Sequence, residues 1–309
     1  MKQLNSGLNS GKVLLSGASG MLGLAISDAL KRQGVSVLRL VRRVPRDANE
    51  LQWDPAGAGI FQPERLEGLS AAVHLSGANV AARRWTAAYK QEMRESRVTS
   101  TRILSQTLAR LKNPPKTLIT ASAVGLYGDR GGEVLSEDSA AGAGYFPELC
   151  AAWEAAAQPA ERAGIRVVHP RFGMVIARDG GAMARLAPLF RLGLGGRLGS
   201  GRQWMSWVSE PDAVSAVLYL LEETTLFGAI NVVAPEPVTN SAFTRELARA
   251  VHRPAVLPAP AFALQLAFGE MADEALLAST RAVPKRLQEA GFVFKHPTLA
   301  QALAEALRS

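Results

Sequence analysis

Three glycines near the amino terminus have the spacing of a phosphate-binding loop. They lie in Gly17-Ala-Ser-Gly20-Met-Leu-Gly23, between an apolar run typical of a strand and an amphipathic stretch typical of a helix. Gly17 permits a tight turn, Gly20 lets the backbone approach a pyrophosphate, and Gly23 lets the helix pack closely against the sheet. The first turn of the helix adds unpaired N–H donors and partial positive charge. The loop therefore predicts a bound dinucleotide rather than a simple tight turn.

Two arginines follow the second predicted strand, where an acidic residue usually binds the ribose hydroxyls of a dinucleotide. Arg42 and Arg43 stand there instead. A guanidinium group at this place can bind a 2′-phosphate through two parallel hydrogen bonds. The alternative is that both side chains are solvated surface residues. Because the carboxylate is missing and two cations are present, the sequence favours NADP(H) over NAD(H).

The elements that would position these residues alternate along the chain. Short β-branched runs are followed by longer stretches with helical apolar spacing, which predicts parallel βαβ units. The expected strands are 12–16, 35–41, 71–75, 117–121, 165–169 and 229–233, and the expected helices are 21–33, 87–111, 147–163 and 240–251. Ser209-Glu-Pro-Asp212 has the composition of a further helix start, with a capping serine and a proline in the first turn.

This alternation predicts an α/β fold, a Rossmann-like doubly wound parallel sheet that binds NADP(H), over residues 12–234. Residues 235–309 are expected to form a smaller, mostly helical carboxyl-terminal lobe, with residues 183–204 contributing to it. Ligands of open α/β sheets bind at the carboxyl edge of the strands. We therefore expect the lobe to close over that edge and to hold the substrate.

The composition excludes several classes of protein. Of 309 residues, 48% are hydrophobic and 20% are charged, which is typical of a globular chain and not of a disordered or collagen-like one. The formal net charge of +8 suggests anionic ligands. The lysines and arginines are scattered, without a basic stripe interleaved with aromatic residues, so nucleic acid is not an expected partner. No apolar run is long enough for a membrane span, and no membrane partner is expected.

The cysteine and histidine content limits the chemistry further. Cys150 is the one cysteine, so no internal disulfide can form and the cytoplasm is the expected compartment. The four histidines are widely spaced and predict no metal site. Residues 1–11 lack the apolar core of a signal peptide and are expected to form a flexible tail.

Several motifs resemble those of the extended short-chain dehydrogenase/reductases, which include nucleotide-sugar epimerases. Besides the glycine loop, these are His74-Leu-Ser-Gly77, Ser122-Ala-Val-Gly-Leu-Tyr-Gly128, Pro170-Arg-Phe-Gly173 and Trp204-Met-Ser-Trp-Val-Ser-Glu-Pro-Asp212. Further motifs are similar to an epimerase-like subfamily whose members sometimes carry the label of cell-division inhibitor. They are Val41-Arg-Arg43, Gln52-Trp-Asp-Pro55, Arg84-Trp85, Glu95-Ser-Arg97 and Arg191-Leu-Gly-Leu-Gly-Gly196. The tail, which includes Leu257-Pro-Ala-Pro-Ala261 and Gly269-Glu-Met271, resembles that subfamily's terminal domain of unknown function.

The resemblance implies a set of cofactor contacts. For the pyrophosphate these are Gly17, Ser19, Gly20, Met21, Leu22 and Gly23, and for the adenosine phosphate Arg42 and Arg43. Leu75, Ser76 and Gly77 would lie beside the adenosine half, and Glu92, Arg97 and Pro170 would complete the set. For Glu92 and Arg97 the alternative is ion pairing on a helix surface.

The wider family uses a tyrosine four residues before a lysine for proton transfer, because the lysine cation lowers the pKa of the phenol. When this chain is aligned on Glu154, Phe146 and Cys150 occupy those two positions, and neither can do this work. The remaining candidates for proton transfer are Ser122, Tyr127 and Tyr145. Cys150 is expected to be a buried, inert residue rather than a nucleophile.

Arginines next to aromatic residues suit an anionic aromatic ligand such as a nucleotide. The substrate candidates are Arg83, Arg84, Trp85, Tyr127, Arg171, Arg202, Gln203 and Trp204, although Trp85 and Trp204 also fit a role in the core.

Two functions are compatible with these residues. The first is an NADP-dependent oxidoreductase or nucleotide-sugar-epimerase-like enzyme, a monomer or homodimer, that transfers a hydride to or from a small carbonyl or sugar-like substrate, free or nucleotide-linked. The second is a catalytically silent NADP(H)-binding protein that senses redox state or regulates a partner, for example in cell division.

Overall fold

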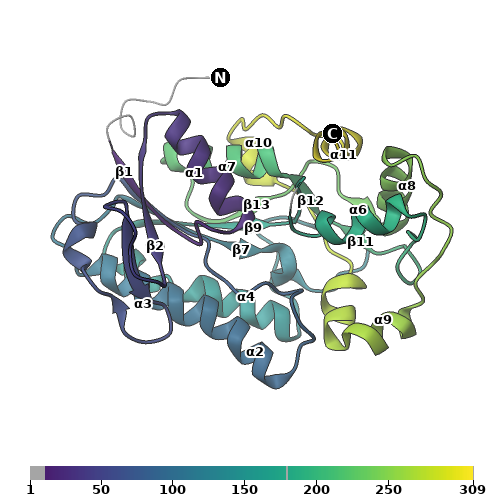
Figure 1. Ribbon diagram of the computed structural model, residues 1–309, viewed down its shortest axis with the longest axis horizontal. Helices are drawn as coiled ribbons and strands as arrows, with labels where there is room; N and C mark the ends of the chain where they lie inside the picture. Colours follow the sequence, from purple (N-terminus) through teal and green to yellow (C-terminus); the bar gives the residue numbers. More distant parts are fainter. Residues whose placement is uncertain (1–10, 179, 309) are drawn as a thin grey trace.

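The centre of the molecule is one large sheet, parallel except at one edge (Figure 1). The computed structural model describes residues 11–178 and 180–308, so residues 1–10 of the predicted tail lie outside the described residues. Across the sheet the strands are β13 (Gly228–Val232), β9 (Arg166–Phe172), β6 (Thr117–Thr120), β5 (Ala71–His74), β1 (Lys12–Ser16), β2 (Ser36–Val41), β3 (Glu50–Asp54) and β4 (Gly59–Ile60), and β7 (Ser122–Ala123) also pairs with β9. The predicted Rossmann-like fold is confirmed.

All six predicted strands are present within a few residues of their predicted ends. The sequence analysis missed β3 and β4, which extend the sheet beyond β2. In β3 the buried side chains of Leu51 and Trp53 alternate with half-buried Gln52 and Asp54, and β4 pairs with it in the antiparallel direction. Such short strands carry little periodic signal of their own.

Two predicted helices are interrupted. Within 87–111, α2 (Ala87–Arg94) and α3 (Ser100–Ala109) are joined by a π-helical turn, η2 (Glu95–Thr99). Within 147–163 the chain forms α4 (Tyr145–Ala155) and then α5 (Gln158–Arg162), which has a proline in its first turn. The prediction of single uninterrupted α-helices is therefore wrong at both places. Proline lacks the N–H that would continue the hydrogen-bond ladder, and π-turns are frequent at functional sites.

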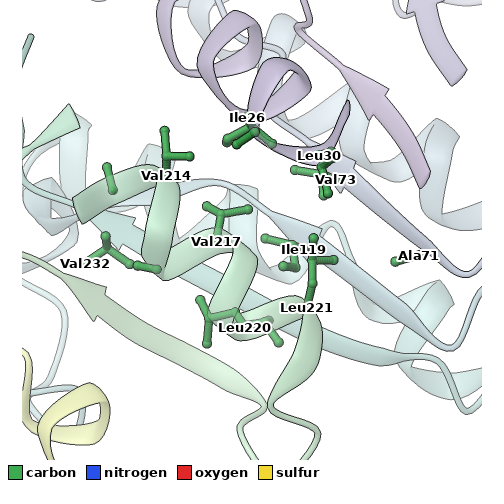
Figure 2. Packing of buried hydrophobic residues seen from close by; sticks show 14 of the residues in the cluster. Ile26, Leu30, Ala71, Val73, Ile119, Val214, Val217, Leu220, Leu221 and Val232 are labelled. Atoms are coloured by element: carbon green, nitrogen blue, oxygen red, sulfur yellow. The ribbon is translucent and has the colours of Figure 1, made fainter. Parts of the chain in front are cut away.

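Helices cover both faces of the sheet (Figure 1). On one face α1 (Met21–Arg32) packs beside α7 (Glu210–Glu222), as Figure 2 shows for Ile26 and Leu30 against Val217 and its neighbours. On the other face α3 and α5 pack over a second apolar cluster. The predicted start of α7 is confirmed, because the Ser209 hydroxyl accepts the N–H of Asp212 at 3.1 Å.

The carboxyl-terminal part shares its core with an earlier segment. The helices α6 (Met183–Arg191), α8 (Asn240–Ala250) and α11 (Leu299–Ala306) contribute to one apolar cluster together with Trp207. Leu287 of α10 (Lys285–Glu289) packs instead into the cluster between the sheet, α1 and α7. The lobe boundary at residues 234 and 235 stays a prediction.

Short strand pairs and two turns complete the part that surrounds the site. The pairs are β10 (Met174–Ile176) with β12 (Trp207–Ser209), β11 (Trp204–Met205) with β14 (Val238–Thr239), and β8 (Val134–Leu135) with β15 (Arg281–Ala282). The helical turns η1 (Pro63–Leu66) and η3 (Val124–Tyr127) follow β4 and β7. The helix α9 (Ala261–Phe268) and the π-turn η4 (Ala272–Leu276) lie near the first half of α2 (Figure 1). Within residues 11–178 and 180–308, no helix combines the length and apolarity that a membrane span requires.

Candidate functional site

The glycine loop joins β1 to α1 and leaves no space for larger residues. Gly17 has a φ of +68°, and a Cβ there would lie 2.8 Å from the carbonyl of Leu75 at the end of β5. A Cβ at Gly23 would overlap the carbonyl oxygen of Gly17. No side chain caps α1 and its first turn carries no acidic residue, so its first N–H groups can face an anion.

A second pair of glycines covers this loop and was missed by sequence analysis. A Cβ at Gly180 would lie 2.7 Å from the sulfur of Met21, and one at Gly181 would lie 3.6 Å from the same sulfur. The turn between β10 and α6 is therefore in contact with the first residue of α1. The only sequence signal was the glycine pair itself, which is too common in turns to assign.

Arg97 lies in the π-turn η2 and is buried beside the end of β5. Its guanidinium donates to the carbonyls of Ala78 at 2.8 Å and Met93 at 3.3 Å, and it lies 5.0 Å from the centre of the Trp153 ring. A Cβ at Gly77 would lie 3.1 Å from this guanidinium. Nε is buried without a partner among the described residues, and burial lowers the pKa of Arg97. Surface ion pairing, the alternative for this residue, does not apply.

Glu92 differs from Arg97. It is about half exposed and lies 3.6 Å from Arg83, so surface ion pairing describes it. Leu75 and Ser76 lie at the carboxyl end of β5, where the Leu75 N–H donates to Ser16. Pro170 is paired with Ile230 across β9 and β13.

The two arginines predicted to bind the adenosine phosphate are not equivalent. Both Nη atoms of Arg43 donate to the Glu50 carboxylate at 2.7 Å, and the Glu50 side chain is buried. Hydrogen bonds from Arg43 and from the Arg46 N–H lower the pKa of Glu50 to about 2. Arg42 is exposed and makes no hydrogen bond or ion pair to any described residue. Glu50 belongs to β3, the strand that the sequence analysis missed.

The two positions at which the family has its tyrosine and lysine are occupied here by packed side chains. Cys150 is fully buried, so the expected burial is confirmed. Burial raises the pKa of its thiol to about 12, which disfavours the reactive thiolate. The Phe146 ring lies so close to Gly125 that a Cβ there would be 2.6 Å from it. The indole of Trp85 also packs on Phe146, with ring centres 5.6 Å apart. Neither the phenol nor the ammonium group of the wider family is present at these two positions.

Two of the predicted hydroxyls belong to one buried network. Ser122 donates to Glu154 at 2.6 Å, and Arg171 donates to both oxygens of the same carboxylate at 2.8 and 2.9 Å. Arg171 also donates to the Tyr127 hydroxyl at 3.0 Å, which in turn donates to Asn231 at 2.8 Å. Burial alone would raise the pKa of Glu154, but the hydrogen bonds and charge of Arg171 outweigh it and lower that pKa. Burial raises the pKa of Tyr127.

Tyr145 is engaged in the same manner, at the first residue of α4. Its hydroxyl donates to the carbonyl of Lys90 at 2.6 Å. The backbone N–H groups of Tyr145 and Phe146 donate to the Glu274 carboxylate at 2.9 and 2.7 Å, and Lys90 binds Glu270 at 2.8 Å. Lys90, Glu270 and Glu274 were missed, although Glu270 lies in the quoted Gly269-Glu-Met271 motif. The carboxyl-terminal turn η4 thus caps the helix that carries the family's acid and base positions.

The remaining substrate candidates are dispersed. Trp85 is buried and donates to the Val80 carbonyl at 2.7 Å, whereas exposed Arg84 donates to the Leu266 carbonyl at 3.1 Å. Gln203 is buried and donates to Leu198 and Leu276, Arg202 is exposed, and Trp204 lies 4.1 Å below the guanidinium of Arg281. Among the described residues, no three histidine, cysteine or acidic side chains are arranged as metal ligands.

Comparison with known proteins agrees with the motifs. Residues 13–232 match the NAD dependent epimerase/dehydratase family, and residues 259–306 match a domain of unknown function (DUF1731). The epimerase family protein Mb2239 of Mycobacterium bovis is 46% identical over 294 residues, which are 95% of this chain and 97% of that protein. The resemblance to an epimerase-like subfamily with its own terminal domain is confirmed.

Two solved structures extend this comparison. The crystal structure of the human epimerase family protein SDR39U1 with NADPH has a TM-score of 0.88 and 32% identity, covering 96% of this chain and 98% of that one. The crystal structure of a nucleoside-diphosphate sugar epimerase from Corynebacterium glutamicum has a TM-score of 0.81 and 32% identity, covering 98% of this chain and 59% of that one.

Proposed function

Because the chain belongs to the NAD dependent epimerase/dehydratase family, we propose that it binds NADP(H) and exchanges a hydride with a small carbonyl or sugar-like substrate. The observation that carries this proposal is the glycine loop, where backbone packing excludes any side chain at Gly17 and Gly23 and leaves the start of α1 uncapped. A cradle of this kind accepts a pyrophosphate. The NADPH bound to human SDR39U1 supports the same cofactor.

Residues on two strand ends would hold the adenosine half. Arg42 would bind the 2′-phosphate, because its exposed guanidinium has no partner among the described residues. Arg43 is already held by Glu50 and would orient the loop after β2 rather than supply the main contact. Leu75, Ser76 and Gly77 would line the adenosine side, and the unpartnered Nε of Arg97 fits a ligand oxygen nearby.

NADP(H), when bound, supplies or accepts the hydride. The chain's own residues have to exclude water and orient the substrate, and proton transfer is the step that they serve poorly. The hydroxyls of Ser122, Tyr127 and Tyr145 each donate to an acceptor within the protein. We therefore propose that water or the substrate itself provides or accepts the proton.

Turnover of the purified chain tests this proposal. We expect the chain to oxidise NADPH with at least one member of a panel of carbonyl compounds and nucleotide-linked sugars. The reaction is measured by the loss of absorbance of the reduced nicotinamide. Tyr145→Phe should leave the turnover number nearly unchanged, because its hydroxyl is directed to the Lys90 carbonyl. A large loss of turnover in this variant, with NADPH affinity and folding preserved, would identify Tyr145 as the proton donor instead.

A second function is favoured by the same hydroxyl contacts. A chain that binds NADP(H) but keeps its polar groups internally paired can act as a redox-dependent regulator of a partner. In that case a partner would bind differently in the presence of NADPH and NADP⁺, and no compound of the panel would be reduced. Turnover with any compound would argue for the enzyme.

A further inference from the structure

A hollow of about 350 Å³ lies between α8 and the segment 255–258. Its lining residues are Arg197, Ser241, Thr244, Arg245, Ala255, Val256 and Pro258. None of them belongs to the glycine loop, to the Ser122 network or to the cap of α4. The proposed function therefore assigns no role to this hollow.

The charge of the hollow is positive and uncompensated. Arg197 and Arg245 are both exposed, and neither forms an ion pair with a described residue. Arg197 makes one hydrogen bond, to the carbonyl of Ser200 at 3.1 Å. Glu246, which follows Arg245 in the chain, is paired with Arg249 at 2.6 Å. Two nearby guanidinium groups without carboxylates create a local potential that attracts anions.

Two of the segments that form the hollow contain no acidic residue. The segments 180–209 and 247–269, which contain four of the seven lining residues, have no aspartate or glutamate, although the whole chain has 27. The two segments lie side by side, because Ala259 donates to the Arg197 carbonyl at 2.9 Å. These two segments therefore supply no carboxylate that could neutralise Arg197 or Arg245.

A buried threonine whose hydroxyl has no partner among the described residues lines this hollow. Thr244 is 5% exposed, and its hydroxyl makes no hydrogen bond to a described residue. A threonine within a helix commonly donates to the carbonyl four residues earlier, and Thr244 does not. Thr244 is one of the residues that line the hollow. A ligand oxygen would satisfy its hydroxyl.

Ser241 adds a second hydroxyl one turn earlier. Residues three and four apart share a helix face, so Ser241, Thr244 and Arg245 lie together on α8. A Cβ at Gly201 would overlap the Ser241 hydroxyl oxygen, so the glycine makes room for that group. The N–H groups of Ser241 and Ala242 already donate to Gly201 and Thr239. Binding would therefore depend on side chains and not on the helix terminus.

We propose that this hollow binds a phosphoryl group. Arginine binds phosphate oxygens through paired, charge-assisted hydrogen bonds, and the two hydroxyls would donate to the remaining oxygens. The phosphoryl group belongs either to a soluble phosphorylated molecule or to a lipid headgroup. Val256, which lines the hollow, and its chain neighbour Leu257 are 72% and 51% exposed and would suit the second source.

Calorimetric titration of the full chain with inorganic pyrophosphate tests the first source. We expect Arg197→Ala and Arg245→Ala each to weaken binding about tenfold, and Thr244→Val to weaken it less, because hydrogen bonds to a charged group are the stronger ones. Arg110→Ala, at an exposed arginine away from the hollow, is the matched control and should change nothing. Because pyrophosphate can also enter the glycine loop, the titrations are repeated in Gly23→Ala, which obstructs that loop, and the effect of the hollow variants should persist there.

Co-sedimentation with vesicles tests the second source. Vesicles of phosphatidic acid in phosphatidylcholine should retain the chain, and Arg197→Ala should release it, if a headgroup is the ligand. Loss of either pyrophosphate or vesicle binding in the Arg197 and Arg245 variants supports the proposal. If neither probe shows binding that depends on these two arginines, the proposal is wrong, whatever the result with NADP(H).

Discussion

The cofactor end and the proton-transfer end of the candidate site both carry motifs of the same family. They differ in how many of their polar side chains are already hydrogen-bonded within the protein. At the cofactor end the glycine loop excludes side chains, and Arg42 remains without a partner among the described residues. At the proton-transfer end, Phe146 and Cys150 are packed, and the hydroxyls of Ser122 and Tyr127 are bound within the protein. Residue type alone suggests chemistry at both ends. Among the described residues compared, Arg42 at the cofactor end keeps its donors free for a ligand, whereas Ser122 and Tyr127 donate within the protein.

Introducing the family's tyrosine and lysine at Phe146 and Cys150 is expected to have the largest effect and tests whether the proton-transfer end is closed to them. Cys150→Lys places an ammonium where the thiol is fully buried, so we expect the free energy of unfolding to fall by at least about 3 kcal/mol. The combination with Phe146→Tyr should not raise turnover. Denaturant unfolding measures the first effect, with Cys150→Ala as the control. A double variant that is stable and has a higher turnover number would show that this region still accommodates the tyrosine and the lysine.

Disrupting the hydrogen-bond network around Glu154 should cause the next largest loss of stability. Glu154→Gln leaves the buried Arg171 cation without its carboxylate, and we expect a loss of about 3 kcal/mol in stability. Because the folded pKa of Glu154 is lowered, its ionised form stabilises the fold above its unfolded pKa of about 4.3, and this is lost as the pH falls through the folded pKa.

The pH dependence provides the control for this prediction. In Glu154→Gln the drop in melting temperature on acidification should be smaller than in the unmodified chain. Glu64→Gln, at an exposed position, should behave like the unmodified chain. If the melting temperature depends on pH in the same way in all three proteins, the ion pair of Glu154 with Arg171 does not contribute the expected stability.

At the cofactor end a single methyl group should be enough to disrupt binding. Gly23→Ala forces a Cβ onto the Gly17 carbonyl oxygen, and overpacking of this kind costs about 1–3 kcal/mol. NADPH affinity should therefore fall about tenfold to hundredfold. Gly132→Ala is the matched control, because a Cβ there meets nothing within 4 Å. Equal affinities in the two variants would contradict the assignment of the loop.

The arginine pair sharpens the comparison with the smallest expected effect. Arg42→Ala should lower NADPH affinity about tenfold and leave NADH affinity unchanged, because only the 2′-phosphate contact is lost. Arg43→Ala should have a weaker effect on NADPH, since its guanidinium is already bound by Glu50. Fluorescence titration of the reduced cofactors measures both. The reverse order would assign the phosphate to Arg43.

The sequence predicted the glycine loop well because its parts are contiguous: strand, turn and helix follow one another, and each glycine has a local reason. It could not distinguish Arg42 from Arg43, since Glu50 comes from a five-residue strand that is too short to be recognised from its pattern. Nor could it show that Tyr127 is occupied, because its acceptor Asn231 lies 104 residues further along the chain. The cap of α4 by Glu274 spans 129 residues and is equally invisible to local patterns. Availability of a side chain is a tertiary property.

The most direct test is calorimetric titration of the unmodified chain with NADPH and with NADH in the same buffer. If the glycine loop binds the pyrophosphate and Arg42 binds the 2′-phosphate, NADPH must bind, and it must bind more tightly than NADH. Equal affinities would remove Arg42 from the site, and the absence of heat with both cofactors would contradict the assignment of the cofactor end altogether.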